Sequence, residues 1–151
     1  MNRRVTTALG AVIGVCAFAL SAAPAQADAA RSTQLVIHND TDCNFRPAER
    51  GGSTGIFITP FAESALPASQ TRSIYTESDG IFSGLDKWQS WASENCSSAV
   101  YNSRSLRLHW VNPYVGSNHW DSAGTDAAFQ VDWSGGGGDN SVLHARISES
   151  T

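Results

Sequence analysis

The pentapeptide GGSTG, residues 51–55, is the first stretch whose residue types suggest catalysis. It fits the pattern Gly-x-Ser-x-Gly, which in α/β-hydrolases holds a nucleophilic serine on a tight turn between a strand and a helix. Here NFRPAER before the motif does not read as a buried strand, and IFIT after it is typical of a strand. We therefore expect Ser53 to be a loop serine, and a small hydrolase built on Ser53 or His119 ranks third among the candidate functions.

The histidines show no metal-ligand spacing in the sequence. They are His38, His109, His119 and His144, and no two stand at the short spacing typical of zinc ligands. His109 and His144 fall on outward-facing positions of expected strands and would approach each other if those strands were neighbours. The acidic turn that begins at Asp40 starts like an EF-hand loop, but Phe45 stands where that loop needs glycine. The sequence predicts no catalytic residue, no metal and no cofactor.

The passage RLHWVNPYVGSNHWD, residues 107–121, has the composition of a binding loop. Pro113 and Gly116 interrupt the strand pattern, and loops lie at the surface, so at least one aromatic ring beyond Pro113 should reach solvent. Tyrosine and tryptophan suit a site that is half wet and half apolar, such as a lipid headgroup or a sugar. The candidate ligand-binding residues are Tyr114, Ser117, Asn118, His119 and Trp120, with Trp88 and Trp91 as a secondary contact. The alternative that Tyr114 and Trp120 fold back to cap the core stays open.

A period of two in hydrophobicity places this passage at the end of a β-strand. Leu106, Leu108 and Trp110 alternate with mainly polar residues, which predicts that Trp110 faces the core. The same alternation recurs in residues 129–133 and 142–147, and the GGGGDN between them predicts an antiparallel hairpin. Further strands are expected in QLVIHN, TGIFIT and TRSIYT. Short strands divided by turns predict an all-β fold, an antiparallel β-sandwich.

The segment SGLDKWQSWASENC, residues 83–96, supports two interpretations. It forms a short helix if Ser83 is the N-cap, because Leu85, Trp88 and Ala92 then share one side. It forms an ordered loop if a disulfide at Cys96 folds it back.

The first 27 residues are typical of a secretory signal peptide. Arg3 and Arg4 precede an apolar run, and small residues then lead to AQA at residues 25–27. Cleavage there leaves residues 28–151, a length that suits one domain, so we expect a single β-sandwich domain in a secreted, extracellular protein. The cleaved segment removes two arginines and no acidic residue, which changes the formal net charge from −4 to −6. This sign argues against nucleic acid as a partner and against a general attraction to anionic lipid.

Cys43 and Cys96 are the two cysteines that follow the signal peptide. An oxidising compartment favours their pairing, and we expect a disulfide between them. A metal site on the two thiols is the weaker interpretation, because neither belongs to a Cys-x-x-Cys pair.

The passage LRLHWVNPYVGSN resembles a segment of aegerolysin-type proteins, in which a strand tryptophan is followed by proline, an aromatic residue, glycine and serine. The opening LVIHNDT and the closing GGGGDNSVLHARI are similar in kind to the first and last strands of that family. The resemblance covers mainly the C-terminal third of the chain. On it, the residues that map onto the motif are Trp110, Pro113, Tyr114, Gly116, Ser117 and Asn118, and Trp120 follows them. It implies a β-sandwich that binds membrane lipids, often sphingolipids, and acts as a cytolysin alone or with a second, pore-forming protein.

Two leading functions follow from these observations. The first is a secreted, cytolysin-like protein that docks on a membrane lipid headgroup through its aromatic loop, residues 114–120, without covalent chemistry. Its negative charge predicts uncharged or zwitterionic lipid and weak salt dependence. The second is a secreted carbohydrate-binding or protein-inhibitor module that uses the same loop, since sugars stack on exposed rings and need polar neighbours.

Overall fold

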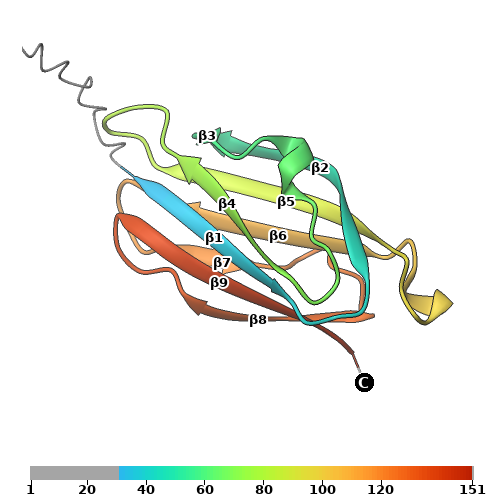
Figure 1. Cartoon of the computed structure of the whole chain (residues 1–151). Helices are drawn as coiled ribbons and strands as arrows, with labels where there is room; N and C mark the ends of the chain where they lie inside the picture. Colours follow the sequence, from blue (N-terminus) through green and yellow to red (C-terminus); the bar gives the residue numbers. More distant parts are fainter. Residues whose placement is uncertain (1–30, 151) are drawn as a thin grey trace, which may run out of the picture.

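The computed structural model describes residues 31–150 and arranges them as two β-sheets packed face to face (Figure 1). The first sheet has the strand order β3 (Ile56–Phe57), β4 (Thr71–Glu77), β1 (Ser32–Asn39), β9 (Asn140–Glu149), β8 (Phe129–Gly135). The second has the order β2 (Asn44–Thr54), β5 (Leu85–Glu94), β6 (Ser105–Asn112), β7 (His119–Asp121). Two short 3-10 helices, η1 (Phe61–Ser64) and η2 (Ala99–Tyr101), lie in connections. The expected signal peptide, residues 1–27, lies outside the described residues.

The predicted all-β sandwich is confirmed. Within residues 31–150 every strand pairing is antiparallel except that of β1 with β9, which is parallel. The hairpin expected around the glycine run is the β8–β9 pair. In the same part of the chain no helix is long and apolar enough to cross a bilayer.

The core between the sheets is formed by the inward positions that the alternation predicts. Leu106, Leu108 and Trp110 are each at most 1% exposed, and the Trp110 indole N–H donates to the Thr76 hydroxyl at 3.0 Å. From the other sheet, Leu143, Ala145 and Ile147 face them with no more than 1% exposure. Aliphatic and aromatic side chains buried to this extent supply the main stabilising term of such a fold.

Residues 83–96 do not form the short helix or the ordered loop expected for them, because ten of them make the strand β5. Alternate residues from Leu85 to Ser93 are buried, but the inward positions include the polar side chains of Lys87 and Gln89. Because these two inward-facing residues are polar, hydrophobicity along this segment does not alternate with a period of two, and the sequence did not predict a strand here. The Lys87 ammonium lies over the Phe57 ring, and the Gln89 amide donates to the Ser64 hydroxyl.

The segment NFRPAER is also a strand, although the sequence did not indicate one. It opens β2, an edge strand that is mostly exposed and whose register shifts between Pro47 and Glu49 and again between Gly51 and Thr54. Proline and such irregularities are tolerated at an edge, where one side of the backbone has no neighbouring strand. The predicted strand in TGIFIT is divided, since Thr54 ends β2 and only Ile56 and Phe57 form β3.

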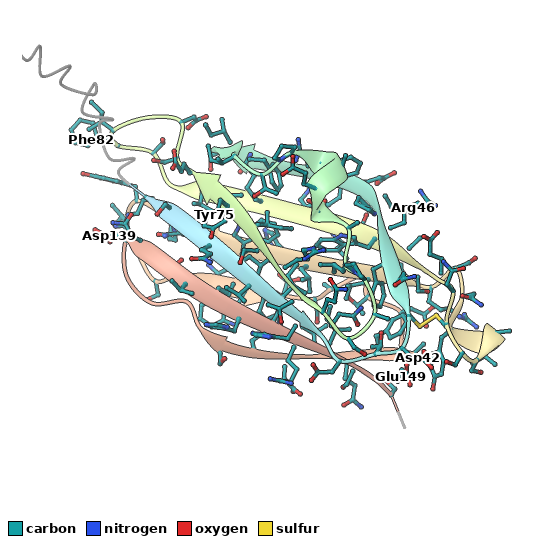
Figure 2. All side chains as sticks on the ribbon, viewed as in Figure 1. Asp42, Arg46, Tyr75, Phe82, Asp139 and Glu149 are labelled. Carbon is teal, nitrogen blue, oxygen red and sulfur yellow. A yellow bond between two sulfur atoms is a disulfide. The ribbon has the colours of Figure 1, made fainter. Side chains whose placement is uncertain are left out.

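The expected disulfide joins Cys43, just before β2, to Cys96, just after β5. It lies at the end of the sandwich that also carries η2 and the C-terminus (Figures 1 and 2). Cys43 is fully buried there.

Reduction of this disulfide should lower the free energy of unfolding by about 4 kcal/mol. The bond spans 53 residues of sequence, and cross-linking a loop of that length removes a corresponding part of the entropy of the unfolded chain. Urea titrations with and without dithiothreitol, each with thiols counted afterwards, measure the difference. Equal midpoints for oxidised and fully reduced protein would contradict the expectation.

Candidate functional site

A pocket of roughly 410 Å³ lies at the end of the sandwich opposite the disulfide. Its walls are the loop between β6 and β7 and the glycine-rich turn between β8 and β9. The lining residues are Arg31, Gly116, Ser117, Asn118, Trp120, Gly135, Gly136, Gly137, Gly138 and Asp139. Three of the five predicted ligand-binding residues, Ser117, Asn118 and Trp120, therefore share one cavity.

Two asparagine amides hold the glycine-rich turn in place. The Asn118 amide donates to the carbonyls of Gly136 and Gly138 at 2.7 and 2.8 Å. Asn112, at the inward-facing end of β6 and only 1% exposed, donates to the carbonyls of Ser32 and Asp139 at 3.1 and 2.9 Å. Backbone carbonyls in a turn have no strand partner, so side-chain amides of this kind satisfy them and fix the shape of the wall.

Arg31 supplies the positive charge of the pocket. Its guanidinium donates to the Asn112 side-chain oxygen at 3.3 Å and to the Tyr114 carbonyl at 2.8 Å, and it pairs with the Asp139 carboxylate at 2.5 Å. These contacts use three of the five N–H groups of an arginine. Among the described residues the other two have no such partner, and Arg31 lines the pocket.

The sequence left open whether Tyr114 and Trp120 reach solvent or fold back onto the core, and the structure gives a different answer for each residue. Trp120 is partly buried and packs against the core while its ring also lines the pocket. Its six-membered ring lies so close to Gly136, whose φ is +86°, that a Cβ at that position would stand 2.5 Å away. Tyr114 is 41% exposed, and its ring meets Phe82 edge-on with centroids 5.6 Å apart.

The remaining predicted site residues lie elsewhere. His119 is exposed on β7 with its ring near that of His109, at a centroid distance of 6.4 Å, and does not line the pocket. Trp91 is 1% exposed and donates its indole N–H to the Ser64 carbonyl at 2.7 Å, so the prediction of a surface contact is wrong for it. Its position on the inward face of β5 explains this burial. Trp88 lies on the opposite face of β5, beside Gly51. The Arg107 guanidinium carbon stands 4.5 Å from the centroid of the Trp88 ring.

A row of polar side chains crosses the outer face of the second sheet. The Ser53 hydroxyl donates to Asp86 at 2.8 Å, and the other oxygen of Asp86 lies 2.9 Å from His109 Nε2. His109 Nδ1 lies 2.9 Å from Asp121. Each of the strands β2, β5, β6 and β7 contributes one residue to this row. A carboxylate thus separates the serine from the imidazole, whereas a serine nucleophile needs the imidazole as its direct partner.

The surroundings of His109 favour its charged form. Ionised carboxylates only accept hydrogen bonds, so two of them at both ring nitrogens require both nitrogens to carry hydrogen. Burial by itself lowers the pKa of His109, but the hydrogen bonds and charges of Asp121 and Asp86 outweigh it and raise the pKa above 6.5. Burial likewise raises the pKa of Asp86, and its hydrogen bonds with Ser53 and His109 more than reverse this effect. The pKa of Asp121 is lowered in the same way by His109.

His109 does not approach His144, because the strands that carry them are not neighbours. β6 and β9 belong to different sheets, so the outer faces of the two strands point away from each other. Each histidine has another histidine close by: His144 Nδ1 lies 3.1 Å from His38 Nε2, and His109 lies near His119.

The sequence reading missed Arg31 and the role of the glycine run as a pocket wall. The sequence GGGGDN indicated a hairpin turn and nothing more. Arg31 stands shortly after the expected cleavage site and belongs to no recognisable motif. Their proximity comes from the parallel pairing of β1 with β9, which sets Ser32 beside Asn140. Strand order of this kind is a long-range property that no local pattern reveals.

The fold and the site define a small two-sheet sandwich with a polar pocket at one end, and solved structures share this fold. The structure of RahU in complex with a TRIS molecule superimposes with a TM-score of 0.61 at 12% identity, covering 81% of this chain and 97% of RahU. The lipid binding protein Nakanori gives 0.61 at 10% identity, covering 80% of this chain and 72% of Nakanori. Both have aegerolysin-like folds, so the fold expected from the sequence resemblance is supported. No protein-family model matches the sequence, and no curated protein matches it either.

Gly136→Ala should destabilise the pocket wall and displace Trp120. The new methyl group would meet the indole ring, and the backbone there has a positive φ that alanine rarely adopts. We expect a loss of about 1–3 kcal/mol in the free energy of unfolding and a changed tryptophan emission spectrum. Gly138→Ala is the matched control, because its φ of +82° gives a similar backbone strain while nothing lies within 4 Å of its added Cβ. Equal effects of the two substitutions would argue against this packing.

The wild-type protein should lose stability as the pH rises above 6.5 in a way that His109→Gln does not. A raised pKa in the folded state means that the contribution of His109 is fully present below pH 6.5 and is lost as the pH rises through the folded value. The lowered pKa values of Asp86 and Asp121 set the acid limit: their contribution is present above pH 3.8 and is lost as the pH falls. Urea unfolding at several pH values, with His144→Gln as control, measures this. Parallel profiles for wild type and His109→Gln would refute it.

Proposed function

We propose that this chain is a secreted lipid-binding protein that holds a zwitterionic phospholipid headgroup in the pocket between the aromatic loop and the glycine-rich turn. The observation that carries the proposal is the presence of a cation, a carboxylate and an indole ring in one cavity, from Arg31, Asp139 and Trp120. The fold shared with a lipid binding protein supports it. The proposal concerns binding and includes no covalent step.

The pocket groups match the two charges of a phosphocholine headgroup. A phosphate accepts from the forked N–H donors of a guanidinium such as that of Arg31. A quaternary ammonium is attracted to an indole face and to a carboxylate, and Trp120 and Asp139 offer both. The four glycines between Gly135 and Gly138 leave the backbone open to close approach.

The charge of the whole molecule favours the same class of lipid. The chain is acidic overall, with a formal net charge of −4, so anionic membranes repel it at long range. Arg31 is itself paired with Asp139, which leaves the pocket close to neutral. Binding that rests on local contacts with a zwitterion should change little with ionic strength.

A glycan is the second candidate for the same pocket. Ser117 and Asn118 are polar neighbours of a partly exposed indole ring, and this arrangement also suits a sugar. A sugar carries no phosphate, so it makes less use of the Arg31 charge. The response to substitution of Arg31 therefore separates the two ligands.

Arg31→Gln should weaken binding to phosphatidylcholine vesicles by about tenfold or more, because it removes a charged hydrogen-bond donor to the phosphate. Arg72→Gln is the matched control: it makes the same change in net charge on the exposed face of β4. Co-sedimentation at two salt concentrations, with soluble glycans as competitors, measures the difference. Equal vesicle binding by the two variants, or no vesicle binding by the wild-type protein, would overturn the proposal. Glycan binding that Arg31→Gln leaves intact would favour the second candidate.

A further inference from the structure

Four apolar side chains project from the end of the sandwich that carries the pocket. Ile81 and Phe82 are each 77% exposed, Val115 is 83% exposed and Tyr114 is 41% exposed. The first three are the most exposed large apolar residues among those described. Figure 2 shows Phe82 at the same end as Asp139 of the pocket, whereas Asp42 and Glu149 lie at the other end. We call these four residues the apolar tip.

The two loops that carry the apolar tip are fixed to each other. At Gly84 a Cβ would stand 2.7 Å from the Pro113 Cα and from the Tyr114 backbone nitrogen, so only glycine allows this approach. The Ser83 hydroxyl bonds to the Asp79 carboxylate and to the Gly80 carbonyl, both at 3.0 Å. Ile81 and Phe82 are therefore exposed on an ordered loop. Binding does not have to order this loop, so it loses little conformational entropy there.

Tyr114 connects the apolar tip to the pocket. On one side its ring contacts Phe82, with centroids 5.6 Å apart. On the other side its carbonyl accepts from Arg31, whose guanidinium also lies 5.9 Å from the Tyr114 ring centroid. Outward from the pocket, a charged group is thus followed by an amphipathic ring and then by purely apolar side chains.

This order of groups is the order of polarity across the surface of a bilayer. Charged headgroups lie outermost, tyrosine prefers the interface, and phenylalanine, isoleucine and valine prefer hydrocarbon. We propose that the apolar tip inserts among the acyl chains of a zwitterionic phospholipid layer while the pocket holds a headgroup. The inference rests on the proposed function and adds the depth and direction of docking, with the pocket end of the sandwich facing the membrane.

A second copy of the chain is the other candidate to cover the apolar tip, and the size of the patch argues against it. A stable interface between proteins buries at least about 1,000 Å² in total. Four side chains on two projecting loops offer an area of only a few hundred Å². A bilayer needs no complementary shape, so a small projecting patch is sufficient there.

The test compares tip variants with a matched control at the other end of the molecule. Phe82→Ser and Val115→Ser should each weaken binding to phosphatidylcholine vesicles, by about tenfold or more for Phe82, because a buried phenyl ring contributes that much. Val100→Ser makes the same change as Val115→Ser at a residue 62% exposed in η2, and it should bind like the wild-type protein. Calorimetry with soluble phosphocholine should give equal affinities for the wild-type protein, Phe82→Ser and Val100→Ser, since neither substituted residue lines the pocket.

Insertion depth is measured separately with vesicles that carry bromine on their acyl chains. Phe82→Trp should gain fluorescence that these lipids quench, whereas Tyr75→Trp on the outer face of β4 should gain fluorescence that they do not quench.

The outcomes distinguish a failure of this inference from a failure of the proposed function. If the tip variants bind vesicles like the wild-type protein and phosphocholine binding is intact, the tip does not insert, although the pocket still binds a headgroup. If the wild-type protein binds neither vesicles nor phosphocholine, both proposals fail. Self-association that Phe82→Ser abolishes, without vesicle binding, would assign the apolar tip to a second copy.

Discussion

The parallel pairing of β1 with β9 is the constraint on which the pocket end of the molecule depends. Strands in a parallel pair begin at the same end of the sheet, and the register sets Ser32 beside Asn140. The residues that precede these partners, Arg31 and Asp139, therefore meet and form an ion pair although they lie near opposite ends of the described chain. An antiparallel pairing would place the start of β1 beside the end of β9 and would leave the glycine-rich turn without a cation.

A buried amide of the second sheet completes this arrangement. Asn112 occupies the inward position that follows Leu106, Leu108 and Trp110 on β6, where the alternation calls for another apolar residue. Its side chain instead bonds to carbonyls of β1 and of the glycine-rich turn and to Arg31. Hydrogen bonds shielded from water are stronger than exposed ones. The single break in the apolar pattern of β6 thus marks a point where several polar contacts join the two sheets.

The sequence predicted those features of the fold that depend on local alternation. The inward faces of β6 and β9 and the β8–β9 hairpin followed from a period of two in hydrophobicity. β5 was missed because Lys87 and Gln89 face inward and interrupt that period. The disulfide was predicted because only two cysteines follow the expected signal peptide, and export to an oxidising compartment favours their pairing.

The site was predictable to a smaller extent, and the reason is again the distance in sequence. Ser117, Asn118 and Trp120 were found because they share one loop. Arg31 and Asp139 each precede a different strand and meet only through sheet order, so residue composition could not indicate them. Phe82 was missed because a single apolar residue in a short loop has no periodicity. Exposure identified it, and exposure is known only from the folded chain.

The two ends of the sandwich are closed by different kinds of interaction. One end has a covalent bond between Cys43 and Cys96, with a T-shaped contact of Phe45 and Phe129 beside it. Among the described residues, the pocket end has no covalent closure and is held by hydrogen bonds, the Arg31–Asp139 ion pair and close glycine contacts. Segments held in this way open locally at lower cost than the core. A ligand that bridges Arg31 and Trp120 would therefore add stability at the end where the described chain has no covalent closure, and binding would be coupled to the order of that end.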